Sequence, residues 1–111
     1  MRSENNSKAN MNINVHSIHF DADTKLVGFI REKLEKLALF HDHIVAAEVY
    51  LRLDHDSTRR ENKVAEIKLM VPGRELFAKR HCKTFEEATD EAAEALRRQV
   101  ERMKTRLRKA S

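Results

Sequence analysis

Residues 64–78 have the sequence VAEIKLMVPGRELFA, in which apolar and polar side chains alternate on both sides of a Pro-Gly pair. Alternation of this kind places every second side chain on the same face of a β-strand. Pro72-Gly73 is a dipeptide typical of tight turns. We therefore expect two antiparallel strands joined by this turn. The side chains expected to face the core are Ala65, Ile67, Leu69, Val71, Leu76 and Ala78.

Two segments before this hairpin also alternate. Residues 45–53 place Val49, Leu51 and Leu53 on one face, and they are separated from the hairpin by a charged segment that we interpret as a loop. Residues 11–20 alternate as well, with a change of phase near Ser17, and this pattern predicts a strand with a bulge.

Two segments have helical periodicity. Residues 24–40 follow Asp23, a favourable N-cap residue, and carry an apolar stripe at helical spacing. Thr84 and Glu87 form a capping-box pattern that opens a second, longer helix. The first stripe consists of Leu26, Ile30, Leu34 and Leu37, and the second of Phe85, Ala88, Ala92, Leu96, Val100, Met103 and Leu107.

The expected element order is β-α-β-β-β-α, an α+β fold. A helix between the first two strands makes them parallel and joins them by a right-handed crossover, whereas the remaining strands form an antiparallel meander. Because each helix has a single apolar stripe, we expect two roughly parallel helices packed on one face of a four-stranded mixed sheet. We expect one domain over residues 11–111, preceded by a disordered lead-in at residues 1–10.

Composition excludes several classes of protein. The 111 residues contain no apolar run long enough to span a membrane, and two glycines cannot form a glycine-rich phosphate loop. The single cysteine, Cys82, cannot form an internal disulfide. The first residues lack the apolar region of a signal peptide, so we expect a cytoplasmic protein.

The helix at residues 84–109 has strongly polarised charge. Its first half carries only acidic charges, whereas from Arg97 onward it carries seven basic residues and one acidic residue, Glu101. The helix dipole explains the order of signs, but it acts mainly over the last turn and does not explain the number of bases. A helix of about 25 residues is roughly 37 Å long, so its basic end should extend beyond strands of roughly 30 Å.

The predicted strand directions place the C-terminal ends of both helices and the Pro72-Gly73 turn at one end of the fold. Because basic residues lie on all three segments, we expect a surface that binds nucleic-acid phosphates, for which arginine is well suited. The net charge of +4 permits such a partner without requiring it. Lys79 is expected on the open face of the sheet, and Phe29 and Phe40 are interpreted as core-edge rather than base-stacking residues. The candidate RNA-binding residues are Lys33, Lys36, Arg74, Lys79, Arg97, Arg98, Arg102, Lys104, Arg106, Arg108 and Lys109.

The residues do not indicate an enzyme. No histidine spacing matches a zinc motif, and no nucleophile is paired with a base. Cys82 is interpreted as a small hydrophobic residue at a strand end. We therefore expect no catalytic residue, metal, cofactor or small-molecule substrate.

The chain resembles the ribosome hibernation-promoting factors. Residues 11–37 are similar to the opening strand and helix of that family, and FHDHI at residues 40–44 follows as it does there. Residues 84–109 resemble its final helix, including the pattern of Leu96, Arg98, Gln99 and Val100. Ala95 and Glu86 depart from the lysine and tyrosine that the family often has at these places.

The resemblance implies binding to the small ribosomal subunit and its rRNA, in the mRNA and tRNA channel near the decoding centre, with a block of translation in stationary phase or stress. By position it implies contacts from Lys33, Lys36, Arg98, Arg102, Lys104, Arg106 and Arg108. The length resembles the short members, which act with a ribosome-dimerising partner factor.

Three alternatives remain open at this point. The segment from Thr24 onward has the element order of a double-stranded-RNA-binding domain, but the last helix begins with acidic residues that would repel phosphates. The second alternative is a protein-interaction module that modulates a transcription factor through the basic end of the last helix. A metal-dependent enzyme using the histidines is the third.

Overall fold

The computed structural model describes residues 11–41, 43–55 and 60–110, with side chains up to Thr105 in the last helix. The expected disordered lead-in at residues 1–10 lies outside this part. The elements are β1 (Asn12–Ser17), α1 (Thr24–Phe40), β2 (Ala46–Leu53), β3 (Lys63–Val71), β4 (Arg74–Cys82) and α2 (Phe85–Ala110). The predicted β-α-β-β-β-α order is confirmed.

The four strands form one sheet in the order β1-β2-β3-β4. β1 and β2 are parallel, and the other two pairs are antiparallel. The register aligns Val15 with Val49, Val49 with Ile67, and Ile67 with Ala78. One apolar row therefore crosses the whole sheet on a single face.

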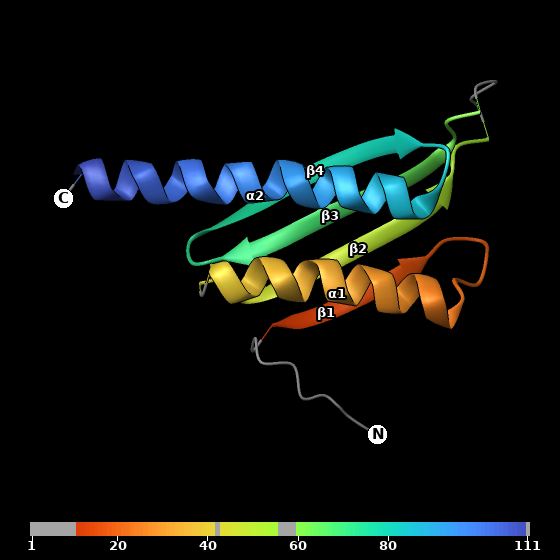
Figure 1. Cartoon of the computed structure of the whole chain (residues 1–111), viewed down its shortest axis with the longest axis horizontal. Helices are drawn as coiled ribbons and strands as arrows, with labels where there is room; N and C mark the ends of the chain where they lie inside the picture. The colour runs from red at the N-terminus through yellow and green to blue at the C-terminus, as the bar shows by residue number, and fades with distance from the viewer. Residues whose placement is uncertain (1–10, 42, 56–59, 111) are drawn as a thin grey trace.

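Both helices pack on that face (Figure 1). They run side by side in the same direction, so their C-terminal ends lie at one end of the molecule together with the β3–β4 turn. The core lies between helices and sheet, and its largest fully buried side chains include Ile30, Leu34, Leu51, Ile67, Leu69 and Leu96.

Local signals in the sequence fix the element ends. The Asp23 carboxylate accepts a hydrogen bond of 2.8 Å from the Leu26 amide, as expected of an N-cap. The Thr84 hydroxyl accepts one of 3.0 Å from the Glu87 amide at the start of α2. Gly73 has a φ of 82°, which a type II turn requires at its second central position.

The first strand is shorter than predicted, and the expected bulge is wrong. β1 ends at Ser17, and His19 then adopts a φ of 67°, in the left-handed region. The phase change near Ser17 therefore marks the point at which the chain leaves the sheet. Phe20 turns back and stacks on Phe85 with ring centroids 5.0 Å apart, which covers this end of the core.

The C-terminal part of α2 extends beyond the sheet, as the length argument predicts (Figure 1). Val100 is 2% exposed, whereas Met103, one turn further, is only partly buried. Gln99 holds the helix against the edge strand, because its Nε2 donates a 2.9 Å hydrogen bond to the main-chain oxygen of Phe77. The apolar stripe of α2 therefore leaves the core after Val100.

The packing of α1 predicts a contrast between two leucines. Leu34 is 0% exposed and Leu39 is 55% exposed. Replacement of Leu34 by Ala should lower the free energy of unfolding by about 2–5 kcal/mol, because it leaves a cavity under the helix. Replacement of Leu39 by Ala should change it by less than about 0.5 kcal/mol. Urea unfolding of both variants measures this, and equal losses would contradict the assigned packing.

Candidate nucleic-acid interface

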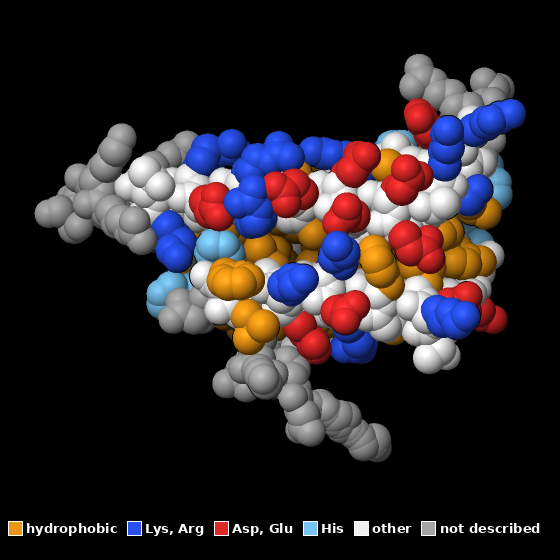
Figure 2. All heavy atoms as spheres, in the orientation of Figure 1, with side chains coloured by type: hydrophobic (Ala, Val, Ile, Leu, Met, Phe, Trp, Pro, Cys, Tyr) orange, Lys and Arg blue, Asp and Glu red, His pale blue; other side chains and the backbone are white. Residues whose placement is uncertain are grey.

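Basic side chains from different elements meet at the end of the molecule where both helices terminate. Arg74, directly after the β3–β4 turn, and Arg102 of α2 line the same cavity of about 150 Å³. Figure 2 shows a row of Lys and Arg side chains along the C-terminal half of α2, with Asp and Glu side chains beside it and toward the helix start. We call the surface formed by Lys36, Arg74, Arg98, Arg102 and Lys104 the basic pole.

Most of the basic pole lacks an internal counter-charge. Within the described part of the chain, Lys36, Arg74, Arg102 and Lys104 form no ion pair with a carboxylate. Arg98 is 58% exposed, and its Nε lies 3.8 Å from an oxygen of Glu94, a weak contact. These cations can therefore bind an external anion without first breaking a strong contact.

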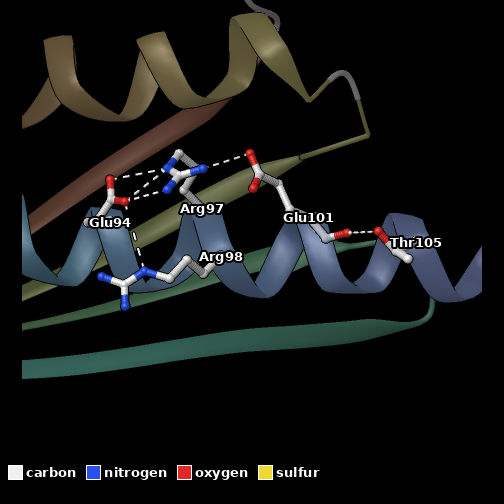
Figure 3. Close-up of polar contacts among 5 residues, drawn as sticks. All are labelled: Glu94, Arg97, Arg98, Glu101 and Thr105. Atoms are coloured by element: carbon white, nitrogen blue, oxygen red, sulfur yellow. Dashed lines mark hydrogen bonds and ion pairs between the residues drawn. The ribbon is translucent and has the colours of Figure 1, made fainter.

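Arg97 behaves differently from the neighbouring bases (Figure 3). Its guanidinium lies 2.5 Å from an oxygen of Glu94 and 2.7 Å from one of Glu101. Hydrogen bonding to Arg97 lowers the pKa of Glu94, and hydrogen bonding to Glu94 and Glu101 raises the pKa of Arg97. Two carboxylates thus neutralise Arg97. Glu94 lies three residues before Arg97 and Glu101 four residues after it, a spacing that predicts ion pairs on a helix from the sequence alone.

Lys33 and Lys79 are also paired. Lys33 Nζ lies 3.0 Å from an oxygen of Asp90, which joins α1 to α2, and 5.4 Å from the Phe29 ring centroid. Lys79 lies on the sheet face opposite the helices, 3.8 Å from Glu66, as its alternation predicts. The structure therefore does not bring Lys79 to the basic pole.

The remaining candidates, Arg106, Arg108 and Lys109, belong to the last turns of α2. Their side chains lie outside the described residues. They stay predictions from the sequence.

The open face of the sheet has balanced charge. The His16 and Tyr50 rings stack with centroids 4.7 Å apart, and His16 contacts Glu48 at 2.6 Å. Hydrogen bonds from Asn14 and His16 lower the pKa of Glu48. Arg52 forms an ion pair with Glu66, the same residue that contacts Lys79. Arg52 and Lys79 already face a carboxylate, whereas Lys68 lies over the Tyr50 ring, 6.0 Å from its centroid. With most of its cations engaged, this surface is a weaker candidate for phosphate binding.

The described residues show neither a metal site nor a reactive thiol. Over residues 11–41, 43–55 and 60–110, no cluster of three His, Cys, Asp or Glu side chains is placed to hold a metal. Burial and, to a lesser extent, Glu91 raise the pKa of the Cys82 thiol to about 11. The thiolate, which is the nucleophilic form, is therefore scarce at neutral pH.

Neither helix, over its described residues, has the length and apolar character needed to cross a membrane.

A groove of about 340 Å³ lies between the C-terminal half of α1 and the middle of α2. Leu37, Phe40 and Ala93 form its apolar part, and Lys36 and Arg97 also line it. Apolar side chains are visible between the two helices in Figure 2. Phe40 is 72% exposed, so the interpretation of this residue as part of the core edge is wrong.

A cationic pole on a β-α-β-β-β-α sheet is a surface suited to a polyanion. The family model described as sigma 54 modulation protein / S30EA ribosomal protein matches residues 13–108. The chain belongs to this family.

Known proteins are similar in sequence and in fold. The chain is 37% identical over 82 residues to a ribosome hibernation promotion factor from Deinococcus radiodurans, an alignment that covers 73% of the chain but 42% of that relative. The chain thus spans less than half the length of this relative.

Two solved structures share the fold. The Protein Y N-terminal domain of Thermus thermophilus superposes with a TM-score of 0.71 at 24% identity, covering 84% of this chain and 99% of that domain. A ribosomal subunit interface protein from Coxiella burnetii gives a TM-score of 0.75 at 17% identity, covering 86% and 99%.

The raised pKa of Cys82 predicts an unreactive thiol. At pH 8, a thiol reagent should label the folded protein at least about a hundred times more slowly than the protein unfolded in urea, because only the thiolate reacts. Cys82 is the single cysteine of the chain, so all of the signal belongs to it. Similar rates in the two states would show that this strand end is open to solvent.

Proposed function

We propose that the protein is a ribosome hibernation factor. It binds the small ribosomal subunit in the mRNA and tRNA channel near the decoding centre and blocks translation in stationary phase or stress. Family membership and the name of the Deinococcus radiodurans relative support this proposal. The alternative, a module that binds a transcription factor or another protein through the end of α2, is an outcome of the test below.

The observation that carries the proposal is the basic pole. Four of its five cations form no ion pair with a carboxylate in the described part of the chain, and three structural elements supply the five. Cations gathered in this way repel one another, and a partner rich in phosphates relieves that repulsion. Arginine adds bidentate contacts to phosphate oxygens.

The mechanism requires no catalytic step. The end of α2 extends beyond the sheet as a single helix with a basic sequence, so it can enter an RNA-lined channel. The rest of the fold then occupies space that mRNA or tRNA would take. Phosphate neutralisation provides the affinity and steric occupancy provides the inhibition. If the five cations of the basic pole contact phosphates, log affinity should fall with log salt at a slope of about −3.5 to −4.5.

The proposal predicts the effect of charge reversal at the pole. A triple variant with Arg74→Glu, Arg98→Glu and Arg102→Glu should no longer co-sediment with small ribosomal subunits. The side chains are exposed, so the fold should survive, and circular dichroism and thermal melting check this. Translation in a cell-free system should then proceed in its presence.

A matched control reverses three exposed cations elsewhere, with Lys25→Glu, Arg31→Glu and Lys83→Glu. Both triple variants have the same net charge, but the control should still bind. If both variants lose binding equally, net charge alone explains the effect and the position of the cations does not. Normal binding by the pole variant would refute the assigned surface. Nuclease digestion of the ribosome before the assay should abolish binding. Binding that survives digestion would favour the protein-interaction module.

A further inference from the structure

Phe40 is exposed to an extent unusual for a large aromatic side chain. It is the last residue of α1, and it is 72% exposed. Aromatic rings of this size normally contribute to cores or interfaces, where they bury a large area. Since Phe40 contributes little to this core, its ring is available to a partner.

The surroundings of the ring fit a flat apolar group. Phe40, Leu37 and Ala93 line the groove between α1 and α2, and its volume of about 340 Å³ lies at the small end of the range for ligand pockets. A groove of this size is suited to one planar ring system. It is too small for an amphipathic helix with several anchors, the usual occupant of an apolar protein groove.

The charges that line the groove balance, with three cations (Lys33, Lys36 and Arg97) against three carboxylates (Asp90, Glu94 and Glu101). The carboxylates that line it are already engaged, since Asp90 contacts Lys33, and Glu94 and Glu101 contact Arg97. The remaining cation, Lys36, has no carboxylate partner in the described part of the chain. The groove therefore presents an apolar ring with one unpaired cation, Lys36, beside it.

We propose that Phe40 stacks on one unpaired base of ribosomal RNA, with Lys36 at an adjoining phosphate. Unpaired bases bind proteins by stacking on aromatic rings, whereas phosphates bind cations, and the two contributions respond differently to salt. This inference rests on the proposed function and adds a contact that phosphate neutralisation does not supply. In this arrangement the groove binds an RNA base, and the other cations of the basic pole bind phosphates of the RNA backbone.

The first experiment separates stacking from electrostatics. Phe40→Ala should weaken binding to purified small subunits by about 5- to 150-fold, and Phe40→Tyr should retain the affinity. The slope of log affinity against log salt should be the same for wild type and Phe40→Ala, because no phosphate contact is lost. Leu39→Ala, an exposed apolar neighbour outside the groove, should bind as wild type does. Unchanged affinity in Phe40→Ala would overturn the proposal.

The second experiment detects the stack directly. The chain contains no tryptophan, so Phe40→Trp introduces a single reporter. Its fluorescence should be quenched when small subunits are added, whereas Leu39→Trp should retain most of its emission.

The outcomes distinguish this inference from the proposed function. An unquenched Phe40→Trp protein that still binds subunits in a nuclease-sensitive way would overturn stacking and leave the proposed function intact. A wild-type protein that does not bind subunits would overturn both. Binding that is weakened by Phe40→Ala but persists after nuclease digestion would assign the groove to a protein partner and overturn stacking.

Discussion

The parallel packing of two helices on one face of the sheet is the constraint on which the rest of the molecule depends. Because β1 and β2 are parallel, α1 must run antiparallel to both, and the meander that follows returns α2 in the same direction. Both helices therefore present their C-terminal ends, the negative ends of their dipoles, at one pole. Lys36, Arg102 and Lys104 lie before the last turns of their helices, so the dipoles engage their charge little and leave it available to a partner.

Internal carboxylates divide the cations of the chain into two groups. Glu94 and Glu101 neutralise Arg97, Asp90 pairs with Lys33, and Glu66 contacts Lys79. These pairs are partly exposed and individually weak, but they keep the middle of the molecule nearly neutral. Lys25, Arg31, Lys68 and Lys83 also form no ion pair within the described residues, but they are dispersed along the chain. The pole gathers such cations where the carboxylates of α2 become scarce. The surface is consequently directional, which a net charge of +4 alone would not predict.

The sequence predicts the fold well because its local signals agree with one another. The bounds of α1 follow from Asp23 and the leucine stripe, and the β3–β4 turn follows from Pro72-Gly73. The first strand is the exception, because a change of phase in the sequence does not distinguish a bulge from a strand end. In the structure the strand ends at Ser17, and His19 then adopts a left-handed conformation. Among site residues, the meeting of Arg74 with Arg102 follows from topology. The exposure of Phe40 does not, because it depends on how far neighbouring elements reach beyond the end of α1.

The most direct test of the account is the structure of the protein bound to the small ribosomal subunit, determined by electron cryomicroscopy. The account predicts that Arg74, Arg98 and Arg102 lie against rRNA phosphates, with the end of α2 inside the mRNA channel and the open face of the sheet turned away. A complex in which the open face or the acidic first half of α2 meets the RNA, while the basic pole faces solvent, would contradict it.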